Sequence, residues 1–441
     1  MRPVGPPINL VAAIVACAPH SSSPTAADAT DASTTSGEVA TTTDDATTTE
    51  ETSTTGEPSC TPGSGEPGGT LLWSRSGPDL SFPPRFAEMN AAGELVLVGF
   101  DGSDVLLEVR DAAWNLRWSD VYAGVNGLED RPLALAVDAE GFVHVLLSET
   151  IRMVHKETFP EVDARLVLLR YAPDGGHVWR WEQTPPPPTG FLNEVIPAGM
   201  VAVEGDEVRV IDHSCCGPTT SLRLDRFGNL VETIVLDAPT DLLRSRYAFA
   251  RDGGLHAAVN HEYAGGEHAL WVGRFARDGA LEWSDQFGSL DDRPAALVAG
   301  HEGDVYLAWS TSLAAGMVHH LRRYDAGGAE SWTEKLALTG LDVGVASGVV
   351  RCDGVLLITG ATEQPLLPGG ELFARKVLWA AAFTAAAGEA WAIEHAFGPV
   401  DSYGGGGFIT ATPEGDALVL GDFLDAETEE YAPWIGRFAG G

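Results

Sequence analysis

The chain has 441 residues, of which 44% are hydrophobic and 20% are charged, and its formal net charge at pH 7 is −36. This apolar content is ample for a large core. It exceeds what one ordinary domain uses, unless a repeat builds one long domain. A surface this acidic repels nucleic acid and anionic lipid, so we expect no nucleic-acid partner; the charge favours solubility and suits cations or basic proteins.

The N-terminus has the features of an export signal. An apolar stretch from Ile8 to Ala16 ends at Cys17 and is far too short to span a bilayer. The run Ile14-Val15-Ala16-Cys17 resembles the bacterial lipobox. This resemblance implies a lipoprotein signal peptide at 1–16, cleavage before Cys17, and a lipid on the Cys17 sulfur as the only membrane attachment. Ala18 follows the cysteine, which favours the outer membrane; a secretory peptide cut at another site is the alternative.

Residues 17–69 are predicted to form a disordered tether rich in Thr, Ser, Asp and Glu. Thr41-Thr42-Thr43-Asp44-Asp45 is typical of its composition. Such a segment cannot bury enough apolar area to offset the entropy cost of ordering it. A flexible chain of about 50 residues has an r.m.s. reach of roughly 40 Å, which would let a globular head stand off the membrane.

From residue 70 onward the chain consists of short apolar runs separated by Gly and Asp, and it lacks long helical periodicity. The four expected strands of one unit are Leu133–Val137, Phe142–Leu146, Leu166–Tyr171 and a last strand ending near Trp179. Tight turns at 138–141 and 173–176 join the first strand to the second and the third to the fourth. Their glycines suit hairpins because glycine accepts positive φ without a Cβ clash.

A marker position in the fourth strand recurs about every fifty residues, which is the sequence signature of a repeat architecture. The marker positions are Trp73, Trp118, Trp179, Glu232, Trp283, Trp332 and Trp391. We interpret the tryptophans as contacts between neighbouring repeat units. At Glu232 the hairpin is kept and the aromatic residue is lost.

The two ends of the repeat region complement each other. Gly68–Trp73 reads as a fourth strand without a preceding third, and Trp434–Gly441 reads as a third strand without a fourth. Joined, they complete one blade and protect its edges, whereas an open solenoid has no use for a split repeat. The predicted fold is all-β: a seven-bladed β-propeller at 70–441, closed by strand 70–75 adding to the sheet near 405–439.

The repeat resembles the SBBP-type β-propeller repeat of exported bacterial proteins. The resemblance lies in the turn Val137-Asp138-Ala139-Glu140-Gly141 and in an Arg-Φ-x-x-x-Gly-x-x-x-Trp hairpin, seen from Arg170 to Trp179 and from Arg274 to Trp283. The hairpin also resembles that of tryptophan-docking propellers that bind pyrroloquinoline quinone. The resemblance implies an architecture and not a chemistry, because members mostly lack assigned activities.

The strand order predicts two unlike faces. The tight turns share one face, which we call the turn face, while the second-to-third connections and the blade crossovers share the opposite loop face. All the long insertions fall on the loop face: Ser148–Ala164, Glu182–Glu194, Asn260–His268, Thr362–Lys376 and Glu394–Gly404. Binding residues concentrate on loops held by a rigid scaffold, so we expect ligands on this face.

An aspartate stands just ahead of the first strand in six units. These residues are Asp79, Asp130, Asp241, Asp292, Asp342 and Asp401. They could ring the mouth of the central channel and hold a cation or a basic peptide. The structural alternative, which we favour, is that each carboxylate accepts backbone N–H groups where the chain enters the inner strand.

Four cysteines remain besides Cys17, an even number in a chain expected to be exported, so disulfides are possible. We favour pairing Cys60 with Cys352 and Cys215 with Cys216, although four cysteines allow three pairings. The spacing of cysteine and histidine fits no zinc site. Calcium-loop, phosphate-loop and nucleophile-elbow motifs are also missing from the sequence, and we expect no cofactor.

The leading hypothesis is a monomeric, non-enzymatic propeller, lipid-anchored at the outer membrane and facing the periplasm or the cell surface. It would bind a protein or glycan partner through the loop face. One alternative is an envelope enzyme on the same face: a hydrolase, a lyase or a quinone-dependent dehydrogenase. Another is a scaffold for outer-membrane assembly.

Overall fold

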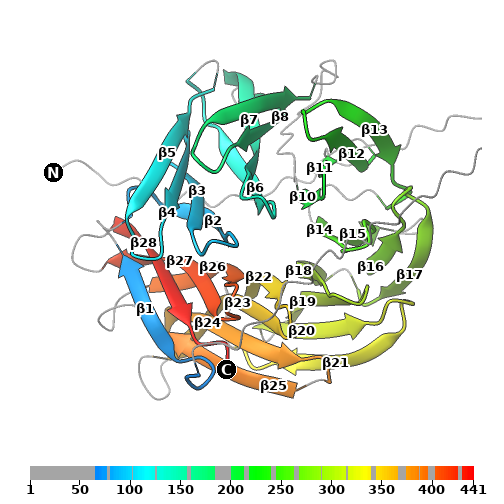
Figure 1. Ribbon diagram of the computed structural model, residues 1–441. Coiled ribbons are helices and arrows are strands. Elements are labelled where there is room, and N and C mark those ends of the chain that lie inside the picture. Colours follow the sequence, from blue (N-terminus) through cyan, green and yellow to red (C-terminus); the bar gives the residue numbers. More distant parts are fainter. Residues whose placement is uncertain are drawn as a thin grey trace, which may run out of the picture. The chain divides into compact units, whose positions relative to one another are not determined.

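The computed structural model describes residues 65–441 except 77–79, 102, 125–126, 156–159, 184–199, 213–217, 240–244, 263–267, 290, 314–315, 339–343, 366–373, 387, 396–402 and 426–429. In this part of the chain, 28 strands form seven antiparallel sheets of four strands each. The sheets stand side by side around a common centre, with the first strand of each nearest to it (Figure 1). The predicted all-β, seven-bladed propeller is confirmed.

The first four blades follow one another along the chain. Blade 1 is β2 (Pro84–Met89), β3 (Leu95–Phe100), β4 (Val105–Arg110) and β5 (Leu116–Tyr122). Blade 2 is β6 (Arg131–Val137), β7 (Val143–His155), β8 (Pro160–Tyr171) and β9 (His177–Glu182). Blade 3 is β10 (Met200–Glu204), β11 (Glu207–Asp212), β12 (Thr220–Asp225) and β13 (Leu230–Val235). Blade 4 is β14 (Ser245–Phe249), β15 (Leu255–Glu262), β16 (His268–Phe275) and β17 (Leu281–Phe287).

The last three blades include the one shared by both ends. Blade 5 is β18 (Asp292–Ala299), β19 (Val305–Leu313), β20 (Gly316–Tyr324) and β21 (Glu330–Leu336). Blade 6 is β22 (Gly344–Val350), β23 (Leu356–Pro365), β24 (Ala374–Thr384) and β25 (Gly388–His395). Blade 7 is β26 (Tyr403–Ala411), β27 (Ala417–Asp425), β28 (Glu430–Phe438) and β1 (Leu71–Ser76).

The ring closes where the sequence predicts. β1 lies antiparallel to β28, with Leu71 opposite Phe438 and Ser76 opposite Trp434. Beyond the strand ends, the N–H of Gly69 donates to the carbonyl of Ala439 at 2.8 Å, and the N–H of Ala439 donates to the carbonyl of Thr70 at 2.8 Å. Blade 7 therefore joins residues from both ends of the repeat region and leaves no gap in the ring.

The tight turns owe their shape to an aspartate and a glycine. In the turn between β6 and β7, the N–H of Gly141 donates to the carbonyl of Asp138 at 2.9 Å. The Asp138 carboxylate accepts the N–H groups of Glu140 and Phe142, at 3.0 and 2.8 Å. Gly141 has φ +85°, a conformation in which a side chain is strained. The predicted hairpin chemistry is therefore present.

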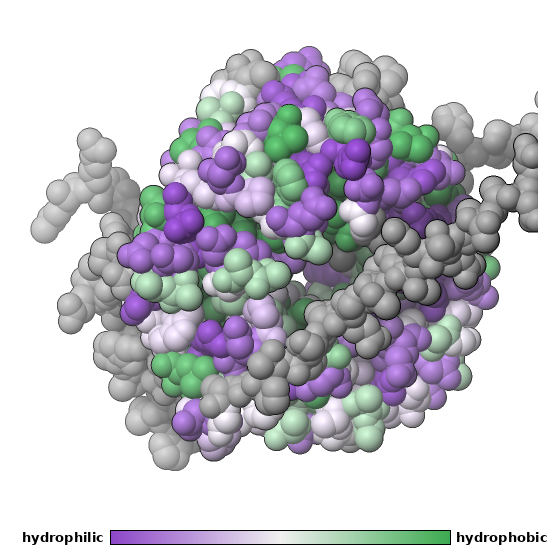
Figure 2. Space-filling view, in the orientation of Figure 1, coloured by the Kyte–Doolittle hydropathy of each residue, from purple (hydrophilic) through white to green (hydrophobic). Residues whose placement is uncertain are grey.

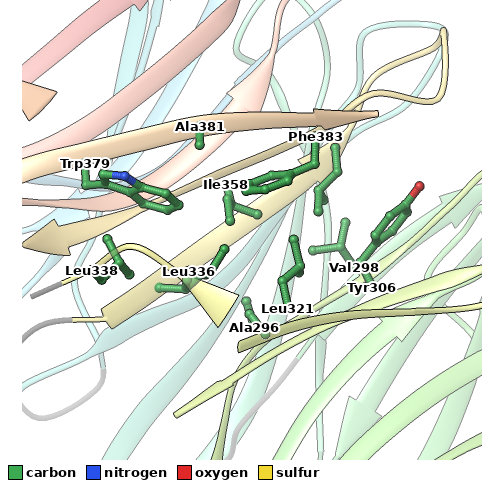
Figure 3. Packing of buried hydrophobic residues seen from close by; sticks show 13 residues of the cluster. Ala296, Val298, Tyr306, Leu321, Leu336, Leu338, Ile358, Trp379, Ala381 and Phe383 are labelled. Atoms are coloured by element: carbon green, nitrogen blue, oxygen red, sulfur yellow. The ribbon is translucent and has the colours of Figure 1, made fainter. Parts of the chain in front are cut away.

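The core is divided among the junctions between blades. Among the described residues, each of the seven junctions contains one cluster of buried apolar side chains. Figure 3 shows the junction of blades 5 and 6, where Tyr306 and Leu321 of one blade face Ile358, Trp379 and Phe383 of the other. Central strands are covered on both sides, so they read as unbroken apolar runs rather than as alternating ones.

The insertion Ser148–Ala164 differs from the loop expected from sequence. Most of it is strand: the β7–β8 ladder continues beyond the core to the pair His155 and Pro160. The second-to-third ladders of blades 6 and 7 also run on, to Pro365 opposite Ala374 and Asp425 opposite Glu430. Antiparallel backbone pairing satisfies these N–H and C=O groups without any apolar pattern. The loop face therefore carries projecting hairpins.

Candidate functional site

The recurring tryptophans lie on the turn face and connect neighbouring blades. The indole N–H of Trp179 in blade 2 donates to the carbonyl of Arg226, in the β12–β13 turn of blade 3, at 2.8 Å. Gly228 of that turn has φ +81°, and a Cβ built on it would lie 2.8 Å from the indole, so only glycine fits. The equivalent indole contacts are Trp118 to Pro173, Trp283 to Ala326, Trp332 to Ala385 and Trp391 to Gly440.

The arginine of the repeated hairpin contacts the same turns. Nη1 of Arg170 donates to the carbonyl of Arg226 at 2.7 Å, the same oxygen that Trp179 contacts. Arg323 shares the carbonyl of Ala385 with Trp332 in the same way, at 3.0 Å. Hydrogen bonds from a charged donor are stronger than neutral ones. The arginine and tryptophan of the motif thus hold the blades together, which agrees with our interpretation of the tryptophans.

The junction of blades 7 and 1 departs from this pattern. Its turn has Trp114, at φ +69°, where the corresponding turns of blades 2 to 5 have glycine. The ring of Trp73 meets Trp114 edge-on, with centroids 5.7 Å apart and planes at 65°. The guanidinium groups of Arg75 and Arg110 lie 5.9 and 5.3 Å from the Trp114 ring. An aromatic and cationic stack therefore replaces the tryptophan–glycine contact where the ring closes.

The junction of blades 3 and 4 departs in another way, because Glu232 replaces the tryptophan. Glu232 pairs with Arg223 at 3.0 Å, and Arg223 pairs with Glu207 at 2.6 Å. Glu207 also pairs with Arg277 of blade 4. Ile234 lies against Gly279 instead of an indole, and a shallow depression open to solvent remains beside it. Surface ion pairs of this kind contribute little stability, so they do not replace the tryptophan contact that joins most neighbouring blades.

On the loop face, Asp130 is fully buried just ahead of β6. Its Oδ1 accepts the N–H of Thr150 at 3.1 Å, and the Thr150 hydroxyl donates to the carbonyl of Glu129 at 2.6 Å. Burial raises the pKa of Asp130 to about 6, while the N–H groups of Thr150 and Gly124 partly offset this rise. The carboxyl group fixes the chain where it enters the inner strand, as the structural alternative requires.

Asp292 has the same role in blade 5. It is 5% exposed, and its Oδ2 accepts the N–H of Ser289 at 2.6 Å and the Ser289 hydroxyl at 3.2 Å. Oδ1 accepts the hydroxyl of Thr311, and the Asn260 side chain donates to the Asp292 carbonyl. These contacts come from the same blade and from its neighbour. Neither Asp130 nor Asp292 is exposed to a ligand in the channel.

The other predicted site residues fall mostly outside the described residues. This holds for four of the channel-mouth acids and four of the cysteines: Asp79, Asp241, Asp342, Asp401, Cys17, Cys60, Cys215 and Cys216. The carboxylate ring stays a hypothesis at those four positions. Cys352 is described, in the turn between β22 and β23, and it is disulfide-bonded.

A buried ionic cluster beneath the β7–β8 hairpin escaped the sequence analysis. Glu149 is 0% exposed and pairs with Arg165 at 2.5 Å and with Arg180 at 3.1 Å. The hydroxyl of Tyr122, from blade 1, donates to Glu149 Oε1 at 2.9 Å. Burial and this bond raise the pKa of Tyr122. Glu149 follows Val145 and Leu147 in the alternation of inward-facing residues, so the sequence pattern indicates that it is buried. That pattern does not indicate which residues contact it.

Polar side chains of the inner strands also bridge blades around the centre. The partly buried Glu88 accepts the N–H of Val137, in the next blade, at 3.0 Å. Desolvation raises the pKa of Glu88 to about 8, and the Val137 N–H acts in the opposite direction. Arg246 donates from Nε to the carbonyl of Ala295, also in the next blade, at 2.7 Å. These groups are tied to the scaffold that surrounds the channel.

The surface offers no single apolar patch on the side that Figure 2 shows. Polar and apolar residues intermix on its uncovered part, and the ring is hollowed near its centre (Figure 2). No group of three or more His, Cys, Asp or Glu suited to a metal ion occurs among the described residues. Within the same residues, no helix has the length and apolar character needed to cross a membrane.

The chain matches no protein-family model, and it matches no curated protein. Among solved structures it is similar to a chain of the mitotic checkpoint complex, at 10% identity over 84% of this chain and 93% of that chain, with a TM-score of 0.49. It is similar to virginiamycin B lyase from Staphylococcus aureus at 11% identity, over 82% and 98% of the two chains, with a TM-score of 0.49. It is similar to the Pan2 WD40 domain of Neurospora crassa at 8% identity, over 83% and 94%, with a TM-score of 0.47. The assignment of seven blades rests on the strand pairing described above.

Proposed function

We propose that this propeller is a non-enzymatic binding module of the cell envelope, which contacts a protein or a glycan through its loop face. The observation that carries the proposal is the asymmetry of the disc. The turn face consists of short turns whose polar groups are bonded to neighbouring blades. The loop face carries hairpins that project beyond the core, in blades 2, 6 and 7. Binding residues are commonly displayed on such projections from a rigid scaffold.

The base of the β7–β8 hairpin supports this proposal. Glu149 and Arg165 face each other across the ladder, and Arg180 and Tyr122 tie the same carboxylate to the outer strands of blades 2 and 1. A hairpin held at its base by a buried, hydrogen-bonded charge loses less conformational freedom when a partner binds to its tip. This hairpin is therefore our main candidate for the contact.

The proposed location is the outer membrane, with a lipid on Cys17 and residues 17–69 as the tether. The sequence Ile14-Val15-Ala16-Cys17 supports the anchor. The disulfide at Cys352 supports export, because structural disulfides persist in oxidising compartments and are rare in the cytosol. We further propose that the repeats are of the SBBP type, on the basis of the Arg-Φ-x-x-x-Gly-x-x-x-Trp hairpin.

Photo-crosslinking from each face tests the binding proposal. One photoreactive residue replaces Arg152, exposed in the β7 arm of the hairpin, and a matched one replaces Ala139, exposed in the β6–β7 turn. In intact cells we expect discrete adducts, with envelope proteins or glycans, from position 152 and none from position 139. The absence of adducts from position 152, equal labelling from the two positions, or adducts from position 139 alone would overturn the assignment of the binding face.

The anchor is tested separately. Cys17→Ala should abolish incorporation of a labelled fatty acid and release the protein from membranes, whereas the control Cys60→Ala should leave both unchanged. Fatty-acid labelling that persists in Cys17→Ala would refute the anchor while leaving the face assignment intact.

A further inference from the structure

The outer strand of blade 3 has an exposed apolar surface. Among the described residues, ten large hydrophobic side chains are exposed, and four of them lie in β13 or in the turn before it. They are Phe227, Leu230, Val231 and Val235, which are 65%, 48%, 54% and 61% exposed. β13 lies at the outer rim of the ring (Figure 1), and no other strand of the described chain pairs with its outer edge. An exposed apolar edge strand is a template for pairing with another chain.

The outer strands of the other blades are better protected. The residues one before, one after and three after the marker position point away from the next blade, because side chains alternate along a strand. At these positions five of the six other outer strands carry charged residues, namely Arg117, Arg180, Glu182, Glu282, Lys335 and Glu394. The sixth strand, β1, has Ser74 and Ser76. β13 has Val231, Thr233 and Val235, so it lacks the charges that discourage pairing between edge strands.

The backbone of β13 determines how another strand can bind to it. The N–H of Leu236 donates to the carbonyl of Thr219, at the start of β12, at 2.9 Å. In an antiparallel ladder the bonding direction alternates, so every second residue before Leu236 also bonds toward β12. The residues between them, Val231, Thr233 and Val235, direct their N–H and C=O groups away from the sheet. The residues with exposed, uncharged side chains are therefore those whose backbone can bond to another strand.

This edge is complementary to a second copy of itself. Antiparallel pairing about a two-fold axis places Thr233 opposite Thr233 and Val231 opposite Val235. All three residues then gain both of their outward backbone hydrogen bonds, and each valine packs against a valine. Glu232 is the only charged residue of β13, and it lies opposite Ile234 while keeping its ion pair within the blade. Like charges are therefore not directly opposed in this register.

We propose that two copies of this protein pair through β13, so that their third blades form one continuous sheet across a two-fold axis. This dimer replaces the monomer expected from the sequence. The outward positions of β13 carry no charge that would select an acidic or a basic partner, whereas the register satisfies a second copy. Stable interfaces commonly bury about 800 Å² on each partner, more than one short strand offers, so we expect a Kd in the micromolar range.

The dimer leaves the loop faces of both copies uncovered. β13 follows the β12–β13 turn, so it runs from the turn face toward the loop face. Antiparallel pairing therefore turns the two loop faces in opposite directions. The pairing does not depend on the function proposed for the loop face, and each of the two proposals can fail without the other.

Sedimentation of the full chain tests the dimer. The chain carries Cys17→Ala, which removes the proposed lipid and the need for detergent. Between about 1 and 200 µM we expect a shift from monomer to dimer. Val235→Lys places like charges beside the axis and should raise the Kd by about tenfold or more. The matched control is Val121→Lys, because Val121 is 54% exposed at the equivalent position of β5, and it should leave the Kd unchanged.

Cysteine cross-linking tests the register. Bonded residue pairs of antiparallel strands have Cα atoms about 5.5 Å apart, a distance that a disulfide spans. On mild oxidation Thr233→Cys should link to its own copy, with the wild type as background. Val231→Cys and Val235→Cys should link to each other when the two variants are mixed, and each should form few links alone.

Three results would overturn the pairing of copies. The first is a chain that stays monomeric over the whole concentration range. The second is a dimer that Val235→Lys leaves intact or that Val121→Lys weakens equally, since another surface or the general charge would then be responsible. The third is a link in intact cells from a cysteine at position 233 to a different protein alone, which would assign this edge to another chain.

Discussion

Replacement of Trp283 measures how strongly an indole locks two blades. Its ring stacks on Tyr324 at 5.6 Å between centroids and lies 5.9 Å from His256, and its N–H donates to the carbonyl of Ala326 at 3.1 Å. A fully buried tryptophan cut to alanine costs about 3–5 kcal/mol, and half of that suits this half-buried ring. The lost aromatic pair and hydrogen bond add about 1 kcal/mol each. We expect Trp283→Ala to lower the free energy of unfolding by about 3.5–4.5 kcal/mol.

The assay is urea unfolding followed by far-ultraviolet circular dichroism, because the many other tryptophans obscure a fluorescence change. Trp283→Phe keeps the ring contact and loses the N–H donor, so it should cost about 1–2 kcal/mol. The matched control is Glu232→Ala at the equivalent position of blade 3. Glu232 makes only a surface ion pair there, so its removal should cost no more than about 0.5 kcal/mol.

Gly328 supplies the second half of the experiment. It has φ +83°, and a Cβ built on it would lie 2.5 Å from Trp283. Gly328→Ala should therefore cost more in the wild type than in Trp283→Ala, where only the backbone strain of about 1–2 kcal/mol remains. If Trp283→Ala were no more destabilising than Glu232→Ala, or if the two substitutions were additive, indole docking would not be the lock.

Three further predictions concern closure and pH. Deleting Leu71–Ser76 should lower the thermal unfolding midpoint by several degrees, since β28 loses its partner, whereas deleting residues 41–46 should not; equal midpoints would contradict closure. Burial lowers the pKa of His256 to about 4 from an unfolded value near 6.5, so the unfolded chain binds the proton first and stability falls as pH drops through this window. His256→Tyr, matching Tyr306 of blade 5, should reduce the change in the urea unfolding midpoint between pH 6.5 and 4. An unchanged pH dependence of that midpoint would exclude His256 as the cause. For Asp130 the raised pKa means that the folded state holds the proton more tightly, so its cost to stability disappears as pH falls from about 6 to 4. Asp130→Asn should then be neutral or stabilising at pH 7.5, while Asp130→Ala, which leaves the Thr150 amide without its acceptor, should lose about 1–2 kcal/mol in the same titration.

The strands inside the core were predictable from sequence because burial leaves a pattern. Leu133–Val137 was expected as a first strand, and β6 runs from Arg131 to Val137. The marker positions all fall in fourth strands, and the pairing of β1 with β28 follows from the two incomplete units at the ends. In each case apolar runs bounded by Gly and Asp carry the information, since the core and the turns select those residue types.

The parts beyond the core could not be predicted in the same way. The sequence predicts a second strand at Phe142–Leu146, whereas β7 continues to His155. The extension leaves no apolar pattern because backbone pairing in a projecting hairpin needs no apolar alternation. The partners of Glu149 come from three separate strands, so no local spacing reveals them. The carboxylates of Asp130 and Asp292 are recognisable as a repeat, but their burial depends on second-strand residues, Thr150 and Thr311, whose contacts exist only in the folded blade.

The joining of β1 to blade 7 has a consequence for how the molecule is made. A chain synthesised from its N-terminus presents this strand first and its partner last, so the edge strand must wait while all the other sheets assemble. During that interval its unpaired backbone is open to wrong partners and to proteases. Any product cut short before β28 lacks the strand that pairs with β1. The ring can therefore close only after β28 has been synthesised.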